Sequence, residues 1–269
     1  MGETHKMKMA WITDPHFNFI SDKEMEEFVL QNLVKDKPDV FVVGGDIGES
    51  CNIDKYLRAL ANTGVKILYV CGNHDFYGSS FDVVNFRMKE LVKSHPNLFW
   101  LDQEDYVELT SDCALVGAGS WADGRYGDWE GYDLDLNDYH HITDLAYVSK
   151  KDRLKVMQKF AKKATLHARK SLELAFEKYN KVYFVTHVPP WLEASVHEGK
   201  PSDDEWAPHF TCKVMGDMIV DYMDGLNGHL TVLCGHSHGK GECDVLPNVR
   251  VITGESKYGS PKVNRVFNL

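Results

Sequence analysis

Short apolar runs of strand length recur along this chain, and residues of metal-binding type follow each of them. Runs of this kind are typical of strands that are buried on both faces. Segments with helical spacing separate the first three runs, and this alternation predicts βαβ units and a largely parallel sheet. Because ligands collect at the carboxyl ends of parallel strands, we expect these polar residues to share one edge. The runs are residues 8–13, 40–43, 66–70, 182–185 and 230–234.

Gly44, Gly45 and Asp46 follow the second run and form the centre of the expected site. A carboxylate has two oxygens and can bridge two cations about 3.5–4 Å apart, the spacing that two-metal hydrolases use. We therefore expect Asp46 to bridge two metals. The two glycines carry no side chains, which would let a metal, a water and a phosphate approach closely.

The residues after the other runs supply the remaining candidate ligands. Oxygen and nitrogen donors of this kind suit Mn²⁺, Fe or Zn²⁺ better than metals that prefer soft ligands. Each fragment alone is weak, because a lone histidine is more often structural. Their shared placement after strands predicts a metal centre. The candidates are Asp14, His16, Asn73, His187, His236 and His238, with His74 and Asp75 beside Asn73.

The remaining segments predict a single domain over residues 1–269, with a lid or insert at about 119–180. Residues 119–142 are rich in Trp, Tyr, Gly and Asp and have no regular period. Such a long loop is usually functional or mobile, the alternative being a surface loop held by its own aromatics. Ser21 and Glu24 form a capping-box pattern at a helix start. Expected helices cover residues 21–35, 53–62, 82–94, 149–179 and 210–224, and expected strands 100–109, 114–118, 249–253 and 263–267, the last two completing a second sheet.

Charge and composition restrict the partners and the compartment. The net charge of -10 argues against a broad nucleic-acid surface, although bound cations could still attract a small phosphorylated substrate. We expect the lysines of residues 149–179 to form a solvated helix face. No apolar run is long enough to span a membrane, residues 1–8 carry no secretory signal, and the 6 cysteines form no Cys-x-x-Cys pair. We expect a cytoplasmic protein with buried thiols.

The order Asp-x-His, Gly-Asp, Gly-Asn-His-Asp, His and Gly-His-x-His resembles the calcineurin-like metallophosphoesterase superfamily. The resemblance extends from Asp14 to His238. It implies an α/β fold, a four-layer αββα sandwich, with a dinuclear centre at one edge and in-line attack on phosphorus by a metal-bridging hydroxide. It further implies that Asp14, His16 and His238 bind one metal, that Asn73, His187 and His236 bind the other, that Asp46 bridges them, and that His74 contacts the phosphoryl oxygens and assists the leaving group.

Two further residues and two motifs complete the set of candidates. Glu49 lies where some members carry a carboxylate that orients the catalytic histidine, the alternative being an acid at a helix N-terminus. We expect Asp75 to hydrogen-bond backbone or to orient a ligand. Ser120-Trp121 and Asn137-Asp138-Tyr139 resemble motifs of bacterial and phage members and leave the substrate open.

The leading hypothesis is a metal-dependent phosphoesterase, with Mn²⁺ as the expected metal, that acts on a phosphomonoester or phosphodiester. A small phosphorylated molecule or nucleotide is the expected substrate. The alternative is a nuclease for DNA or RNA, with lysines and aromatics that grip a strand. A non-catalytic scaffold would lack ligands that are present here. A hydrolase of another bond has no support in the sequence.

Overall fold

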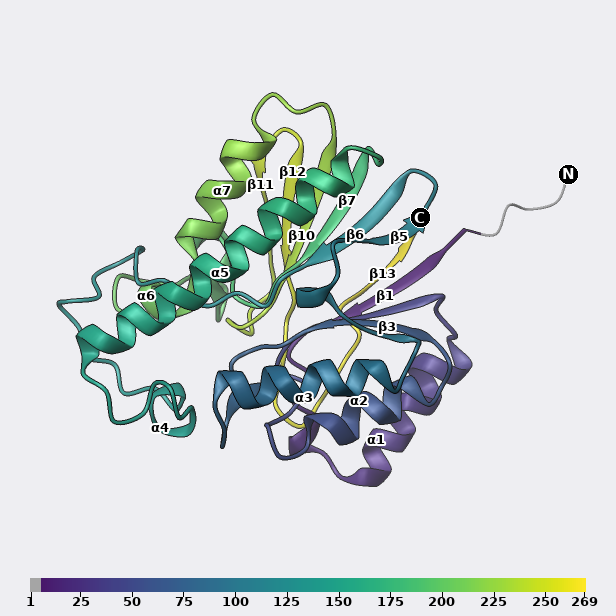
Figure 1. Cartoon of the computed structure of the whole chain (residues 1–269), viewed down its shortest axis with the longest axis horizontal. Coiled ribbons are helices and arrows are strands. Elements are labelled where there is room, and N and C mark those ends of the chain that lie inside the picture. The colour runs from purple at the N-terminus through teal and green to yellow at the C-terminus, as the bar shows by residue number, and fades with distance from the viewer. Residues whose placement is uncertain (1–5) are drawn as a thin grey trace, which may run out of the picture.

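Two β-sheets stack face to face between two layers of helices in the computed structural model, which describes residues 6–269 (Figure 1). Helices α1, α2 and α3 cover one sheet, and α5 and α7 cover the other. The expected αββα sandwich is therefore confirmed. The expectation about a secretory signal concerns residues 1–8 and falls mostly outside the described residues.

The first sheet has the strand order β13-β1-β2-β3-β4. Its members pair in parallel, except that β13 runs antiparallel to β1. The strands are β1 (Lys8–Ile12), β2 (Val40–Gly44), β3 (Lys66–Val70), β4 (Leu98–Trp100) and β13 (Arg265–Asn268).

The second sheet has the order β11-β12-β10-β7-β6-β5, with antiparallel strands at its two edges and parallel pairing between them. All strands that carry candidate ligands are thus parallel within their sheets. The strands are β5 (Val107–Thr110), β6 (Cys113–Gly117), β7 (Lys181–Val185), β10 (His229–Cys234), β11 (Gly241–Leu246) and β12 (Val249–Thr253), and a separate hairpin pairs β8 (Val196–His197) with β9 (Lys200–Pro201).

The helices lie close to their predicted positions. The capping box is present: the Ser21 side chain accepts from the Glu24 backbone, and the Glu24 carboxylate accepts from the Ser21 backbone. The helices are α1 (Asp22–Val29), continued by a π-helical turn (Leu30–Lys35), α2 (Ile53–Ala61), α3 (Phe81–Lys93), α4 (Asp138–His141), α5 (Lys150–Phe176), α6 (Ala207–Phe210) and α7 (Lys213–Met223).

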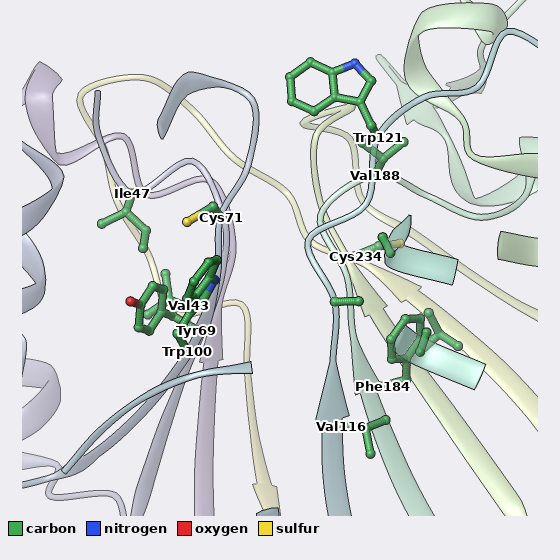
Figure 2. Close-up of a cluster of buried hydrophobic side chains, with 14 of the residues drawn as sticks. Val43, Ile47, Tyr69, Cys71, Trp100, Val116, Trp121, Phe184, Val188 and Cys234 are labelled. Carbon is green, nitrogen blue, oxygen red and sulfur yellow. The ribbon is translucent and has the colours of Figure 1, made fainter. Parts of the chain in front are cut away.

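Side chains alternate between the two faces of each strand and so build two kinds of core. Met9 and Trp11 of β1 point into the space between the sheets, while Ala10 and Ile12 join the core beneath the helices. Figure 2 shows residues of this second core on both sheets, among them Val43. Both faces of the central strands are thus buried, which explains why their sequences are continuous apolar runs.

Two strand predictions were wrong. Residues 100–109 form no single strand, because β4 ends at Trp100 and a 3₁₀ turn (Leu101–Gln103) precedes β5. Residues 263–267 were assigned to the second sheet, but β13 joins the first. The Asn264 backbone N–H donates to Trp11 and the Asn264 side chain accepts from Thr13, so the chain end is held along β1.

Residues 119–142 are irregular apart from α4 and pack largely by their aromatic side chains. Trp121, Trp129 and Tyr139 are buried. The part of this segment nearest the candidate site is the turn at Asn137 and Asp138. A lid role for the segment stays a prediction. Within residues 6–269, no helix is long and apolar enough to cross a membrane.

Candidate metal centre

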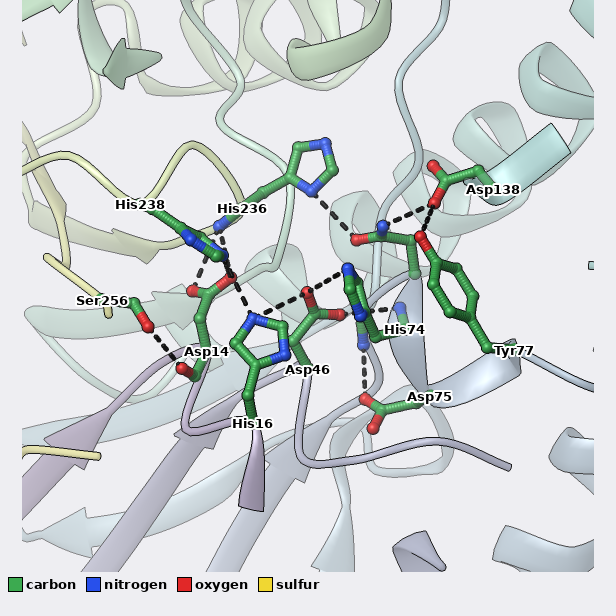
Figure 3. Close-up of polar contacts among 12 residues, drawn as sticks. Asp14, His16, Asp46, His74, Asp75, Tyr77, Asp138, His236, His238 and Ser256 are labelled. Carbon is green, nitrogen blue, oxygen red and sulfur yellow. Dashed lines mark hydrogen bonds and ion pairs between the residues drawn. The ribbon is translucent and has the colours of Figure 1, made fainter. Parts of the chain in front are cut away.

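The loops after β1, β2, β3, β7 and β10 bring all the predicted ligands to one place, where the carboxyl ends of the two sheets adjoin (Figure 3). Much of this backbone is left-handed, which costs about 1–3 kcal/mol per residue outside glycine. Strain of this kind persists where surrounding contacts impose it, and it is frequent at functional sites. The candidate ligands with left-handed backbone are Asp14 (φ 49°), His16 (φ 43°), Asp46 (φ 53°), His236 (φ 66°) and His238 (φ 60°).

The glycines near Asp46 serve a different purpose from the one predicted. A Cβ on Gly45 would lie 2.6 Å from His187 Nδ1, and one on Gly72 would lie 2.2 Å from Asp46 Oδ1. A Cβ on Gly44 would clash with Thr13. The space they leave is therefore filled by ligands and their neighbours, and it is not free for a metal or phosphate.

One half of the centre joins Asp14, His16, Asp46 and His238. One ligand atom from each of these side chains lies within 4.8 Å of every other. His16 Nε2 lies 3.1 Å from His238 Nε2 and 3.6 Å from Asp46 Oδ2, and His238 Nε2 lies 3.5 Å from Asp14 Oδ1. This geometry is compact enough for a single cation.

The other half joins Asn73, His187 and His236 to the second oxygen of Asp46. Asn73 Oδ1 lies 3.0 Å from His187 Nε2 and 3.0 Å from His236 Nδ1. His187 Nε2 is 3.4 Å from Asp46 Oδ1. Asp46 thus turns one oxygen toward each half, as a bridging carboxylate would.

In His187 and His236, contacts with backbone carbonyls determine which ring nitrogen carries the proton. His187 Nδ1 lies 2.9 Å from the Gly44 carbonyl, and His236 Nε2 lies 3.2 Å from the His209 carbonyl. A carbonyl only accepts, so these nitrogens must donate. Burial lowers the pKa of His187 and lowers that of His236 to about 3, so both rings are neutral at pH 7. Their other nitrogens therefore present lone pairs.

Those lone pairs face another acceptor. The Asn73 amide nitrogen donates to Asp138 Oδ1 at 2.8 Å, which leaves Asn73 Oδ1 pointing at the two rings. His187 Nε2, His236 Nδ1 and Asn73 Oδ1 thus converge with no hydrogen between them, and Asp46 Oδ1 lies 3.4 Å from His187 Nε2. Such a group is unfavourable unless a cation lies among its members. The donor set therefore fits a divalent metal, and the same carbonyls would orient the histidines that hold it.

The buried carboxylates of Asp46 and Asp14 also need positive charge beside them. Burial, together with the nearby Asp14 and Asp75 charges, raises the pKa of Asp46 well above its ordinary value. Burial also opposes ionisation of Asp14, but the facing His187, His238 and His16 outweigh it and lower the Asp14 pKa. An ionised Asp46 requires positive charge beside it, which cations would supply.

His74 lies beside these ligands and differs from them in its contacts. Its Nε2 is 4.0 Å from Asp46 Oδ2, and its ring stacks on Tyr77 with centroids 4.3 Å apart. Burial, followed by the facing His187 and His236, lowers the His74 pKa to about 3. His74 also helps to position Asp46, since its backbone N–H donates to Asp46 Oδ1 at 2.9 Å.

Asp75 ties two ligand loops together, as expected for a residue that bonds backbone. It accepts from the Ile47 and Gly48 amides through Oδ1 and from the Gly72 amide through Oδ2. The loops after β2 and β3 are thereby held in register. Asp75 therefore fixes the relative positions of Asp46 and Asn73.

No contact supports the role predicted for Glu49. Its carboxylate accepts from Asn18 Nδ2 at 3.3 Å, and among residues 6–269 no hydrogen bond or ion pair joins it to His74. Its carbonyl accepts from the amide of Ile53, the first residue of α2. The acid in the first turn of α2 is Asp54, so neither role of Glu49 is decided by these contacts.

Sequence reasoning missed several residues that support the second half. Asp138 accepts from Asn73 and, at 2.6 Å, from the Tyr77 hydroxyl. The neighbouring Tyr139 hydroxyl hydrogen-bonds His209 Nδ1, and the His209 carbonyl accepts from His236. The Asn-Asp-Tyr motif was the available signal. Its separation from the ligands along the chain concealed what it contacts.

A pocket of about 560 Å³ opens directly above the centre. Its floor includes Asp46, Asn73, His74, His236 and His238. Its walls come mainly from segments without assigned roles, including the β8–β9 hairpin. The wall residues include Leu136, Asn137, Asp138, His197, Lys200, Asp203, Trp206, Phe210 and Tyr258.

Comparison with solved structures supports this architecture. A dimetal phosphatase from Danio rerio superposes with a TM-score of 0.58 at 15% identity, covering 96% of this chain and 90% of that one. The protein TT1561 of Thermus thermophilus has a TM-score of 0.51 at 15% identity, covering 93% and 89%. At such identities, the similarity establishes the fold alone.

Sequence comparison identifies the family. Protein L509 of Acanthamoeba polyphaga mimivirus, described as uncharacterized, is 28% identical over 148 residues. The match covers 51% of this chain and 52% of the relative, so the chain spans about half the length of the curated relative it matches. A family model described as calcineurin-like phosphoesterase matches residues 7–240. This chain therefore belongs to the calcineurin-like phosphoesterase family.

Proposed function

We propose that this protein hydrolyses phosphate esters with two divalent cations, and that its substrate is a small phosphomonoester or phosphodiester. Family membership and a dimetal phosphatase of the same fold support a metal-dependent phosphoesterase. The observation that carries the proposal is the convergence of His187 Nε2, His236 Nδ1 and Asn73 Oδ1 without a donor among them.

The residues divide between two cations in the way that the contacts suggest. Asp14, His16 and His238 would hold one, and Asn73, His187 and His236 the other. Asp46 would bind both, since its two oxygens face opposite halves. Nitrogen and oxygen donors of this kind suit Mn²⁺, which we propose as the metal, and also accept Fe or Zn²⁺.

When bound, the cations lower the pKa of a coordinated water and neutralise charge on the phosphoryl oxygens. His74 would donate a hydrogen bond from its neutral ring to a phosphoryl oxygen, because its ring lies at the pocket floor. An anionic ester beside this histidine would raise its pKa toward the working range. It could then deliver a proton to the leaving oxygen.

The contacts favour a small substrate over a nucleic-acid strand. The pocket above the centre is of the size that encloses small molecules, roughly 300–1,000 Å³. None of the α5 lysines lines it. Two of them, Lys155 and Lys170, pair with Asp152 and Asp105 instead. A nuclease is therefore the second choice, and a non-catalytic scaffold the third.

The test is hydrolysis of bis(p-nitrophenyl) phosphate and p-nitrophenyl phosphate by protein that has been chelated and then supplied with Mn²⁺. Asp46→Asn serves as the blank. We expect activity that returns with the metal and is absent from the variant. Preference for the diester would indicate a phosphodiesterase, and preference for the monoester a phosphatase.

Two results would contradict the proposal. Equal activity with and without chelation would exclude a metal-dependent reaction. Bound metal with no hydrolysis of either ester, nor of a panel of nucleotides, sugar phosphates and phosphopeptides, would favour the scaffold.

A further inference from the structure

The pocket above the metal centre has aromatic side chains on two sides. On one side Phe210 stacks on the His236 ring, with centroids 4.5 Å apart and planes inclined by 28°. Trp206 packs against Phe210 at 5.6 Å. On the other side Tyr258 lies 4.4 Å from the His16 ring and 5.0 Å from the His238 ring. Both aromatic groups therefore adjoin the candidate ligands themselves.

Two of these aromatic side chains, Trp206 and Tyr258, are exposed. Trp206 is 42% exposed and Tyr258 is 45% exposed, although both line the pocket. By contrast, Trp121 and Trp129 are 6% and 5% exposed. Exposed aromatic surface inside a pocket leaves water against an apolar ring, and a flat ligand would displace that water.

Local hydrogen bonds hold the backbone at Trp206. Asp203 Oδ1 accepts from the Trp206 backbone N–H at 3.1 Å and from the Glu205 backbone N–H at 3.2 Å. Trp206 is the N-cap residue of α6, whose last residue is Phe210. The two rings thus lie at the two ends of one short helix. They form a preformed stacking surface.

The same wall carries a positive charge without a partner. Lys200 of β9 lines the pocket, and among residues 6–269 its ammonium group has no ion pair or hydrogen bond. His197 of β8 lines the pocket beside it. An unpaired cation near a phosphoryl site favours an anionic ligand. Aromatic surface and positive charge therefore occur together on one side of the pocket.

From this arrangement we propose that the substrate is a phosphate ester that carries a planar aromatic group, with a nucleoside phosphate as the form that fits best. Its phosphate would lie over the metal centre and its ring against Trp206 and Phe210. This inference rests on the proposed function and adds the substrate class. The pocket of about 560 Å³ has room for a sugar and a base beyond the phosphate.

The choice of a nucleoside over a simple aryl ester follows from the polar groups around the rings. Asn137 and Asp203 line the pocket together with Trp206. Amide and carboxylate side chains can pair with the donor and acceptor edge of a base, whereas a phenyl ring offers no such edge. A base would satisfy both the stacking surface and these groups.

The test compares ligands that differ only in the ring. Adenosine and ribose 5-phosphonates, in which a methylene replaces the ester oxygen, bind without hydrolysis. Calorimetry on Mn²⁺-loaded protein should find the adenosine compound at least about tenfold tighter, the scale of one stacked base. The esters AMP and ribose 5-phosphate, or their methyl diesters, should show the same ratio in kcat/KM. The phosphonate analogue of phosphotyrosine separates an aryl group from a base.

Trp206→Leu should abolish the difference in affinity between the adenosine and ribose phosphonates. The affinity for ribose 5-phosphonate and for inorganic phosphate should stay unchanged. Phe86→Leu is the matched control, because Phe86 is an exposed aromatic on α3 that does not line the pocket. It should keep the full ratio. Lys200→Ala should weaken both phosphonates by a similar factor.

The outcomes distinguish failure of this inference from failure of the proposed function. Hydrolysis of the nitrophenyl esters with equal affinity for both phosphonates would overturn the aromatic-group inference alone. A ratio that survives in Trp206→Leu would also overturn it. Absence of any hydrolysis, and of phosphate binding to metal-loaded protein, would overturn the proposed function and the inference together.

Discussion

Asp138 accepts the side-chain N–H of Asn73 at 2.8 Å and thereby turns the Asn73 oxygen toward two histidines. The two residues are 65 positions apart along the chain. Because the same Asp138 oxygen accepts from Tyr77, on which His74 stacks, one buried carboxylate contacts residues of both the candidate metal centre and the proposed proton-donor position.

Asp138→Ala should therefore weaken metal binding about 10–100-fold, the usual effect of losing the partner of a ligand. Asp138→Asn keeps an acceptor oxygen and should restore most of the affinity. Tyr77→Phe is the control, since it leaves the Asn73 bond intact. The measurement is Mn²⁺ affinity by calorimetry. Equal affinity in Asp138→Ala and the unmodified protein would remove Asp138 from this role.

Asp46→Asn should weaken both metal sites and reduce kcat/KM by more than about 100-fold, beyond the effect of losing a ligand's partner. The amide is neutral and presents only one oxygen to the two halves. Metal content after dialysis, measured by atomic absorption, checks the result. Glu26→Gln, an exposed acid on α1, is the control. Retention of two metals per chain by Asp46→Asn would show that Asp46 does not bridge.

His74→Ala should keep both metals and lose about 10²–10⁴ in kcat, the usual contribution of a general acid. The loss should be larger for alkyl esters than for nitrophenyl esters, because a poor leaving group needs the proton more. Steady-state kinetics on the two ester types, with metal content measured in parallel, test this. Loss of metal would instead make His74 a ligand.

The sequence predicted the strands and the grouping of the candidate ligands at one edge because both follow from local pattern. Buried parallel strands are continuous apolar runs, and the residues at their carboxyl ends lie at one edge wherever the strands are parallel. The placement of β13 could not be predicted in this way. Its short run has no feature that selects one sheet, and the choice depends on the Asn264 contacts with Trp11 and Thr13.

The residues of the pocket walls could not be predicted from the sequence pattern either. Lys200, Trp206 and Tyr258 lie in segments without helical or strand period, and their approach to the centre depends on tertiary packing. The role of Glu49 stays a prediction. Its proximity to Asp46 along the chain suggested a shared site, and the contact that its carboxylate makes in the structure is with Asn18.

The metal-free protein should lose stability as the pH falls from about 6.5 to about 4, in part through His209. Burial, followed by the Lys150 and Arg153 charges, lowers the His209 pKa to about 4 from 6.5. Between these values the unfolded chain binds a proton that the folded chain does not. His209 therefore supports folding fully above pH 6.5, and its contribution declines below that pH by up to about 1.4 kcal/mol per unit.

His209→Gln isolates this contribution from that of the other buried histidines. Glutamine cannot titrate, and the backbone carbonyl that accepts from His236 is retained. Urea unfolding of chelated protein at pH 7.5, 6.0 and 4.5 gives the free energy of unfolding at each pH. The variant should be less stable at pH 7.5, because Tyr139 loses its ring partner, and its stability should fall less on acidification. Parallel declines in the two proteins would mean that the pKa of His209 is not lowered in the folded chain.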